Sequence, residues 1–264
     1  MSNKKAFKYI YGPVYSWRLG NSLGIDLLSQ KDKKCNFDCT YCQIGKTNEF
    51  TTERKVYVST KNLLGEINQV IDLEFDFITF SGRGEPTLAL NLEEVIVEIK
   101  KIGKHKIAVI TNGTLLDQPD VVRALTQADV VLAKFDVASE EMLQTINRPA
   151  KNVKFGKIIE NFISFRKIFK GKLDLQLMFL DDNKNSVKKI IDAVKLIQPD
   201  ELHINTPLRP CAVKPLTIDE IKKIVEQFEN LQDIKIRTVY DEQQKHIKPI
   251  SEPNTAARRG KEIN

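Results

Sequence analysis

Three cysteines stand close together near the start of this chain. Cys35, Cys39 and Cys42 fall in one short segment, and thiols at such spacing usually bind a metal when the protein works in a reducing compartment. The set suits either zinc or an iron–sulfur cluster. A structural zinc ion needs a fourth protein ligand. The isolated residues that could supply it are Cys211, His105, His203 and His246.

An iron–sulfur cluster gives the three thiols a different use. A cubane [4Fe–4S] cluster held by three cysteines has one iron without a protein ligand. That iron can bind a ligand from outside the protein, which makes the cluster a site for chemistry. Both interpretations stay open from the cysteines alone, because only the fold could bring a fourth ligand to this segment.

The elements that position these residues alternate regularly. Short runs of β-branched residues alternate about six times with longer amphipathic segments, which favours a parallel sheet with crossover helices. Such a sheet is either open and doubly wound or part of a barrel. The predicted strands are residues 23–28, 75–80, 106–111, 130–136, 173–179, 201–205 and 234–239. The predicted helices are residues 60–73, 92–102, 119–126, 140–146, 155–169, 186–197 and 218–228.

The unusual residues gather where the predicted strands end. The cysteines follow the first strand, and a glycine-rich run at residues 81–87 follows the second. Further polar runs follow the third and sixth strands, at residues 111–114 and 205–210. In parallel α/β folds the ligand site lies at the carboxyl ends of the strands. We therefore expect one site on that rim.

Length and composition exclude several classes of protein. The chain has 264 residues, of which 41% are hydrophobic and 29% charged, so it is neither disordered nor collagen-like. Four cysteines are too few for a disulfide scaffold, and no apolar run approaches the roughly 20 residues of a membrane helix. No apolar signal-peptide segment follows the basic residues near the start. We therefore expect a cytoplasmic protein without a membrane segment.

The chain reads as one domain followed by a basic tail. No linker interrupts residues 1–247, which we predict to form a single domain. Residues 248–264 have no apolar period and carry basic residues at Arg258, Arg259 and Lys261, so we expect a loosely ordered tail. The net charge of +6 suits an anionic partner, RNA included. Lysine pairs along the predicted helices offer the alternative of a merely solvated basic surface.

The cysteine segment and its surroundings resemble the radical S-adenosylmethionine (SAM) superfamily. The pattern is Cys-x-x-x-Cys-x-x-Cys with Tyr41 before the third cysteine, followed after the second strand by Gly84-Glu85-Pro86. Other segments resemble one branch, the wyosine-tRNA-synthase-related Fe–S oxidoreductases, and this similarity runs from about residue 8 to about residue 240. These segments are Tyr11-Gly12-Pro13-Val14, Arg18-Leu19-Gly20, Ser22-Leu23-Gly24-Ile25-Asp26, Cys35-Asn36-Phe37-Asp38-Cys39-Thr40-Tyr41-Cys42-Gln43 and Asn205-Thr206-Pro207-Leu208-Arg209-Pro210.

The resemblance implies a fold, a mechanism and two cofactors. The fold would be a partial (β/α)6 TIM-type barrel with a mostly parallel sheet. One [4Fe–4S] cluster would bind SAM at its open iron, and reduction would cleave SAM to methionine and a 5′-deoxyadenosyl radical that abstracts hydrogen from a substrate. The electron would come from a donor such as flavodoxin or ferredoxin. The cofactor performs the difficult step, and the protein orients it and excludes water.

The resemblance also assigns roles to residues. Cys35, Cys39 and Cys42 would ligate iron and so be the catalytic metal ligands, and Tyr41 would lie beside the adenine of SAM. Residues 81–86, Ser-Gly-Arg-Gly-Glu-Pro, match the family's Gly-Gly-Glu-Pro element except that arginine replaces the first glycine. Glu85 would accept a hydrogen bond from the SAM ammonium. The predicted cofactor-binding residues are Tyr41, Ser81, Gly82, Gly84, Glu85, Asn112, Asp136, Asn205 and Arg209.

Some of these residues are predicted from their place on the rim. Lys134 and Asp136 face the same side of a strand, where they contact a ligand or form a structural ion pair. Asn112 either binds the ligand or belongs to a turn, because Asn-Gly is a common turn dipeptide. Arg209 could form a bidentate pair with a carboxylate or phosphate of SAM or substrate.

The sequence leaves the substrate and two other function classes open. The tRNA wyosine-forming enzymes carry further cysteines and a condensing lysine, whereas only Cys211 stands outside the motif here. The substrate candidates are a tRNA nucleoside, a peptide or protein residue, and a small metabolite. A zinc-stabilised RNA-binding protein would contain zinc and no sulfide. An iron–sulfur electron-transfer protein would have a spectrum that does not change when SAM is added.

Overall fold

A single eight-stranded sheet forms the centre of the computed structural model, which describes residues 7–231, 233–241 and 247–259. The strands are β1 (Ile10–Ser16), β2 (Gly20–Ile25), β3 (Phe77–Phe80), β4 (Lys106–Thr111), β5 (Val130–Lys134), β6 (Lys172–Met178), β7 (Glu201–Asn205) and β8 (Lys235–Thr238). They lie in chain order across the sheet. Strands β1 and β2 pair antiparallel, and every later pair is parallel.

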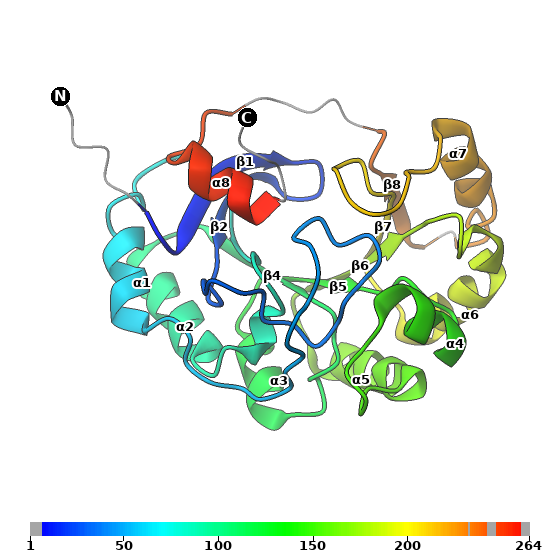
Figure 1. Ribbon diagram of the computed structural model, residues 1–264, viewed down its shortest axis with the longest axis horizontal. Coiled ribbons are helices and arrows are strands. Elements are labelled where there is room, and N and C mark those ends of the chain that lie inside the picture. Colours follow the sequence, from blue (N-terminus) through cyan, green and yellow to red (C-terminus); the bar gives the residue numbers. More distant parts are fainter. Residues whose placement is uncertain (1–6, 232, 242–246, 260–264) are drawn as a thin grey trace.

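Helices connect the parallel strands and cover the outer side of the curled sheet (Figure 1). They are α1 (Thr60–Ile67), α2 (Leu92–Ile102), α3 (Pro119–Thr126), α4 (Glu140–Met142), α5 (Phe155–Ile168), α6 (Val187–Ile197) and α7 (Ile218–Glu226), with short helical turns at Pro86–Leu88, Leu143–Asn147 and Lys184–Ser186. A further helix, α8 (Glu252–Arg259), follows β8. This arrangement confirms the predicted partial TIM-type barrel with a mostly parallel sheet.

Side-chain alternation along the strands separates the core from the interior of the barrel. In β6, Leu175 and Leu177 are fully buried members of the hydrophobic core, whereas Gln176 and Met178 line a pocket inside the barrel. Successive side chains of a strand point to opposite faces, so one strand serves both purposes. The fold therefore directs polar residues inward while its leucines pack against the helices.

Strand β1 was missing from the sequence prediction. It contains Gly12 and Pro13, a pair that reads as a turn, and its register with β2 shifts between Tyr11 and Val14. Proline cannot donate a backbone hydrogen bond and is tolerated on edge strands. Because β1 lies at the edge of the sheet, the proline interrupts no central ladder there.

The structure differs from the expected loose tail at the C-terminal end. Residues 252–259 form α8, which packs against β1 (Figure 1). The Thr255 hydroxyl accepts a hydrogen bond from the backbone N–H of Gly12 at 3.0 Å, and Arg258 Nε lies 3.0 Å from Asp26 Oδ2. These contacts are polar, so the sequence shows no apolar periodicity that would predict the helix. Lys261, which was assigned to the same tail, lies outside the described residues.

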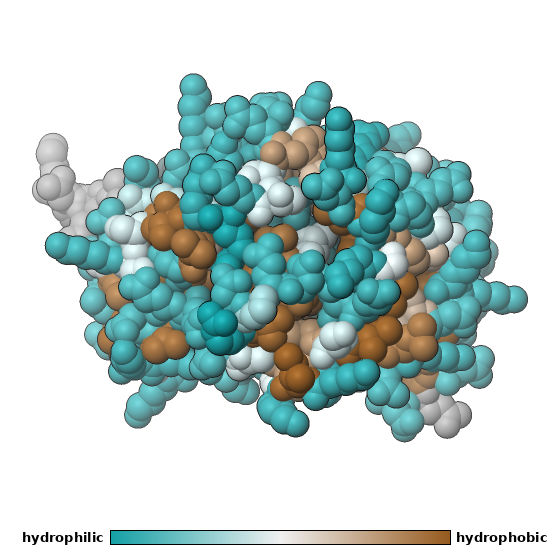
Figure 2. Space-filling view, turned by 90° about the horizontal axis from the view of Figure 1, so that it is seen from below, coloured by the Kyte–Doolittle hydropathy of each residue, from teal (hydrophilic) through white to brown (hydrophobic). Residues whose placement is uncertain are grey.

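The outer surface carries scattered rather than continuous apolar patches on the face shown in Figure 2, where hydrophobic residues lie among hydrophilic ones. Exposed large apolar side chains include Leu90, Ile168 and Leu196, which come from separate elements. Single exposed apolar residues of this kind are normal for globular proteins. Within the described ranges, no helix is both long and apolar enough to cross a membrane.

Candidate functional site

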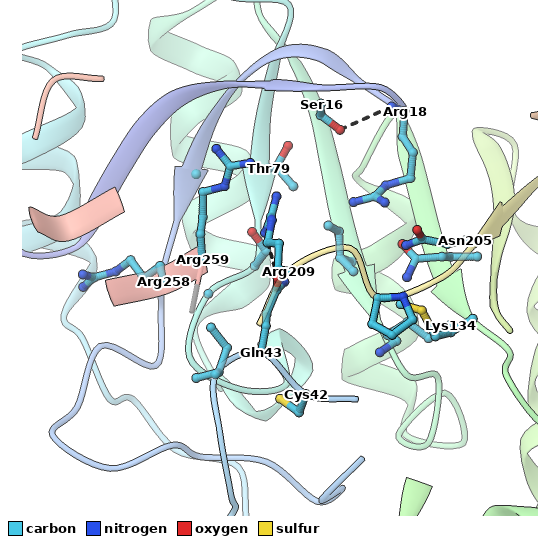
Figure 3. A pocket seen from close by; sticks show the side chains of 18 of the residues that line it. Ser16, Arg18, Cys42, Gln43, Thr79, Lys134, Asn205, Arg209, Arg258 and Arg259 are labelled. Atoms are coloured by element: carbon cyan, nitrogen blue, oxygen red, sulfur yellow. Dashed lines mark hydrogen bonds between the residues drawn. The ribbon is translucent and has the colours of Figure 1, made fainter. Parts of the chain in front are cut away.

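One pocket of about 330 Å³ opens at the carboxyl ends of the parallel strands, where the sequence predicted a site. Figure 3 shows side chains converging on it from the sheet, from the loop that carries the cysteines and from α8. We call residues 33–45 the cysteine loop. The predicted site residues that line the pocket are Cys35, Cys39, Tyr41, Cys42, Ser81, Gly82, Gly84, Glu85, Asn112, Asn205 and Arg209.

Each of the three pocket thiols accepts an N–H donor from the chain. Such donors stabilise negative charge on sulfur and tune the properties of a bound metal. All three cysteines are free of disulfide bonds and half-buried. The contacts are Lys33 Nζ to Cys42 Sγ at 3.2 Å, Asn147 Nδ2 to Cys39 Sγ at 3.4 Å, and the backbone N–H of Phe37 to Cys35 Sγ at 3.4 Å.

The protonation of Cys35 and Cys39 favours ligation over nucleophilic chemistry. Burial raises the pKa of Cys35 to about 12, although nearby Lys33 opposes this. Burial also raises the pKa of Cys39, against the opposing charge of Lys134. A thiol with a raised pKa stays protonated at neutral pH and is a poor nucleophile. Binding to a metal ion deprotonates such a thiol, so the set fits metal ligands.

No fourth cysteine or histidine joins this pocket, as far as the described residues go. Cys211 and His105 form hydrogen bonds to backbone carbonyl groups elsewhere, and His203 bonds to Glu201. His246 lies outside the described residues. The fourth ligand that a structural zinc ion requires is therefore not supplied by the part of the chain that can be placed.

The spacing of the sulfurs also bears on the choice of metal. Four thiolates around zinc, each at about 2.3 Å, place their sulfurs about 3.8 Å apart. Across the described ranges, three ligand atoms within 4.8 Å of one another occur in Asp174, Glu201 and His203 but not in the three cysteines. The more widely set thiols fit the separate corners of a cluster better than one small ion.

The glycine-rich loop after β3 packs directly on the cysteine loop. Gly84 has φ +153° and forms a bridge with Lys34. A Cβ atom on Gly84 would lie 1.7 Å from the carbonyl oxygen of Lys34, so only glycine fits. The backbone N–H of Glu85 donates to that same carbonyl at 3.1 Å. These contacts hold the chain immediately before Cys35 against the strand end.

Glu85 lies at the centre of a buried hydrogen-bond network. Its Oε1 accepts hydrogen bonds from the hydroxyl groups of Thr111 at 2.7 Å and Thr87 at 2.8 Å. Its Oε2 accepts one from the backbone N–H of Asn112 at 2.8 Å. Burial raises the pKa of Glu85, and these donors oppose the rise. The carboxylate thus joins the ends of β3 and β4 at the pocket wall.

The amide side chains predicted to bind the cofactor also organise the loops. Asn112 Nδ2 donates to Asn36 Oδ1 at 2.7 Å, which connects the end of β4 to the cysteine loop. The Oδ1 atom of Asn205 accepts from the backbone N–H of Thr206 at 2.9 Å, and the Ser81 and Tyr11 hydroxyl groups lie 2.5 Å apart. Both asparagines still reach the pocket surface.

Asp136 is the predicted site residue that the structure does not bring to the pocket. Its carboxylate accepts hydrogen bonds from the Tyr41 hydroxyl and from the backbone N–H of Met178, the latter at 3.0 Å. Asn147 donates to it as well. Asp136 therefore fixes the Tyr41 hydroxyl from outside the pocket, while Lys134, the last residue of β5, lines the pocket with its ammonium 4.5 Å from the Tyr41 ring centre.

Four arginines line the pocket, namely Arg258, which pairs with Asp26, and three others from distant parts of the sequence (Figure 3). Arg209 follows β7, Arg18 lies in the turn between β1 and β2, and Arg259 ends α8. Among these, the sequence predicted Arg209. Arg18 was noted there without a role, and Arg259 was assigned to the tail. Only the return of α8 to β1 brings that last residue to the site.

Comparisons with known proteins agree with this geometry. The Radical SAM superfamily matches residues 33–194. The UPF0026 protein of Synechocystis is 38% identical over 211 residues, covering 80% of this chain and 78% of that protein. The UPF0026 protein of Methanocaldococcus jannaschii is 36% identical over 231 residues, covering 84% of this chain and 71% of that protein. This chain belongs to the radical SAM superfamily.

A solved structure shares the fold. Streptococcus suis SuiB bound to S-adenosylmethionine superimposes with a TM-score of 0.62 at 12% identity, covering 78% of this chain. The chain spans about half the length of that structure, 48% of it. Membership of the superfamily confirms that this protein is a radical SAM enzyme and implies SAM and an iron–sulfur cluster as its cofactors.

Proposed function

We propose that Cys35, Cys39 and Cys42 hold one [4Fe–4S] cluster and that the pocket beside them binds SAM. When bound, this cluster supplies the electron that splits SAM into methionine and a 5′-deoxyadenosyl radical, the species that takes hydrogen from a substrate. The observation that carries the proposal is the meeting of three thiols in one pocket, each with an N–H donor.

The chain's own residues would control the electronic environment of the cluster. Lys33 and Asn147 donate to Cys42 and Cys39, and such donors favour the more negative, reduced state of a bound cluster. The cysteine loop also keeps Cys35 beside the buried Glu85 network. An outside donor such as flavodoxin or ferredoxin would deliver the electron.

The pocket wall beside the cysteines supports a SAM site. Glu85 Oε2 has one hydrogen-bond donor in Asn112, and a carboxylate oxygen can accept another, here from the SAM ammonium. Gly82 and Gly84 leave the backbone open to close approach, and Asp136 fixes the Tyr41 ring beside the pocket. Asn205 presents a further amide. SuiB, which shares this fold, binds SAM, in agreement with the proposal.

Metal and sulfide analysis after anaerobic purification tests the proposal. We expect iron and inorganic sulfide in equal amounts, little zinc, and formation of 5′-deoxyadenosine when the reduced protein is mixed with SAM. Zinc without sulfide would instead indicate the RNA-binding alternative. A cluster whose spectrum ignores SAM would indicate electron transfer only.

A pair of cysteine variants assigns the ligands. Cys39→Ser should abolish the cluster and all SAM cleavage, because two thiols cannot hold it. Cys211→Ser is the matched control, since Cys211 does not line the pocket, and should keep wild-type iron content. Equal iron content and cleavage in both variants would refute the ligand assignment.

A further inference from the structure

Arg18, Arg209 and Arg259, which we call the arginine triad, have no acidic partner in the part of the chain that the structure describes. In the ranges 7–231, 233–241 and 247–259, no ion pair includes any of the three. The buried Nε atoms of Arg18 and Arg259 have no hydrogen-bond partner. Arg209 donates to a neutral group, the amide oxygen of Gln43, at 3.0 Å. The pocket therefore holds three guanidinium groups without a counter-charge from the described chain.

The three charges also oppose one another. Burial, reinforced by Arg259 and Arg18, lowers the pKa of Arg209 to about 9. Burial, reinforced by Arg259 and Arg237, lowers that of Arg18 to about 10. Half-buried like charges without an anionic partner cost folding free energy, so the arrangement does not serve the stability of the fold.

The neighbouring Arg258 shows what a structural arginine looks like in this molecule. Its Nε lies 3.0 Å from Asp26 Oδ2, and its guanidinium also donates to the Ser29 hydroxyl at 2.6 Å. In Figure 3 its guanidinium turns away from those of Arg209 and Arg259. Two consecutive residues of α8 thus have different roles, one anchoring the helix and the other facing the pocket.

SAM does not account for the arginine triad. At neutral pH its sulfonium and ammonium groups are cationic and its one carboxylate is anionic, so SAM carries a net positive charge that three guanidinium groups repel. The single carboxylate can form a bidentate pair with one arginine. Two guanidinium groups then still lack an anion.

We propose that the arginine triad binds the phosphate group of the enzyme's second substrate. A phosphate offers several oxygens and up to two negative charges, which match the planar forks of several arginines, whereas a carboxylate offers one charge. The assignment rests on the proposed function for placing SAM in the same pocket. The shared chemistry, a phosphate ester or anhydride, can come from a free nucleotide or from RNA.

Anion binding to the reconstituted full chain tests the proposal without any measurement of turnover. We expect pyrophosphate to bind at least about tenfold more tightly than acetate at constant ionic strength, with and without saturating SAM. Arg18→Gln and Arg259→Gln should each weaken pyrophosphate binding about tenfold and keep wild-type iron content. Arg123→Gln, an exposed arginine on α3 paired with Glu93, is the control and should bind as wild type.

Two further arms distinguish the sources of the phosphate. Displacement of pyrophosphate by a nucleoside triphosphate supports a free nucleotide, and displacement by transfer RNA alone supports RNA. Equal affinity for pyrophosphate and acetate would overturn the proposal, as would binding that the Arg18→Gln/Arg259→Gln double variant retains. A protein that binds pyrophosphate but contains no sulfide would refute the proposed cluster and leave the phosphate site standing.

Discussion

Two charged clusters lie inside this barrel, and they differ in how their charges are balanced. The first, the acid–histidine network, consists of Asp174, Glu201 and His203 with Lys172 near the amino ends of β6 and β7. The second is the arginine triad of the pocket. The first cluster contains both acidic and basic side chains, whereas the second contains only positively charged ones. This contrast distinguishes a cluster that supports the fold from one that we propose to bind a ligand.

The acid–histidine network contains acidic and basic groups that pair with one another, although Asp174 Oδ1 and His203 Nδ1 have no hydrogen-bond partner among the described residues. Lys172 Nζ lies 2.6 Å from Glu201 Oε2 and 3.0 Å from Asp174 Oδ2. His203 Nε2 lies 2.9 Å from Glu201 Oε1, and Arg237 Nη1 lies 3.7 Å from the same oxygen. Although burial opposes ionisation of Glu201, its partners His203 and Lys172 lower its pKa to about 2. The ammonium of Lys172 thus pairs with both carboxylates of the three residues that could otherwise hold a metal cation.

The largest expected effect is the loss of one network acid. Glu201→Gln should lower the free energy of unfolding by about 3 kcal/mol, because it leaves Lys172 and Arg237 beside a neutral group in a buried setting. Urea denaturation measures this. The control is Glu98→Gln at an exposed ion pair with Lys101, for which about 0.5 kcal/mol or less is expected. Equal effects of the two variants would mean that the network is no more than a surface pair.

A second prediction concerns the protonation of His203. Burial lowers its pKa to about 4 despite the hydrogen bond to Glu201, so we expect its NMR titration midpoint well below the ordinary 6.5. As the pH falls, His203 is protonated in the unfolded chain before it is protonated in the folded one. The stability that comes from the neutral histidine is therefore complete above pH 6.5. It is lost as the pH falls toward 4, amounting to about 2 kcal/mol by about pH 5.

The pKa of Asp174 shifts in the opposite direction, so direct NMR titration of His203 is a better measurement than the pH dependence of stability. Burial raises the pKa of Asp174 to about 6, against the charge of Lys172. This contribution has the other sign, since it is complete below pH 3.8 and is lost as the pH rises through 6. The two terms partly cancel in the unfolding free energy. A His203 midpoint at or above 6.5 would contradict the neutral histidine on which the balanced network depends.

The smallest effect is expected in the arginine triad. Arg18→Met should leave the free energy of unfolding of the ligand-free protein unchanged or raise it by about 1 kcal/mol, because it removes a half-buried charge that has no acidic partner in the described chain and keeps an apolar stem. The same urea measurement applies. A loss as large as that of Glu201→Gln would show that Arg18 supports the fold, and the contrast between the two clusters would then fail.

The sequence predicted the fold, and most of the site residues that it predicted line the pocket, because their signals are local. The seven parallel strands β2 to β8 follow from apolar runs, and the pocket residues from Cys35 to Arg209 follow strand ends, which meet on one rim in a parallel sheet. Asp136 fails this logic, since its carboxylate turns to Tyr41 and not to the pocket. Whether a polar residue at a strand end faces a ligand or a neighbour depends on contacts that the sequence pattern does not encode.

By itself the sequence determined the thiol chemistry and the sheet that carries it, because both depend on spacing along the chain. Only the tertiary structure decided which charges meet. Residues 18, 209 and 259 are far apart in sequence, and α8 reaches β1 through polar bonds that leave no period to detect. The balance of charges depends on which side chains meet in the folded chain. Only the structure therefore shows that one cluster is neutralised and that the other has no acidic partner within the described ranges.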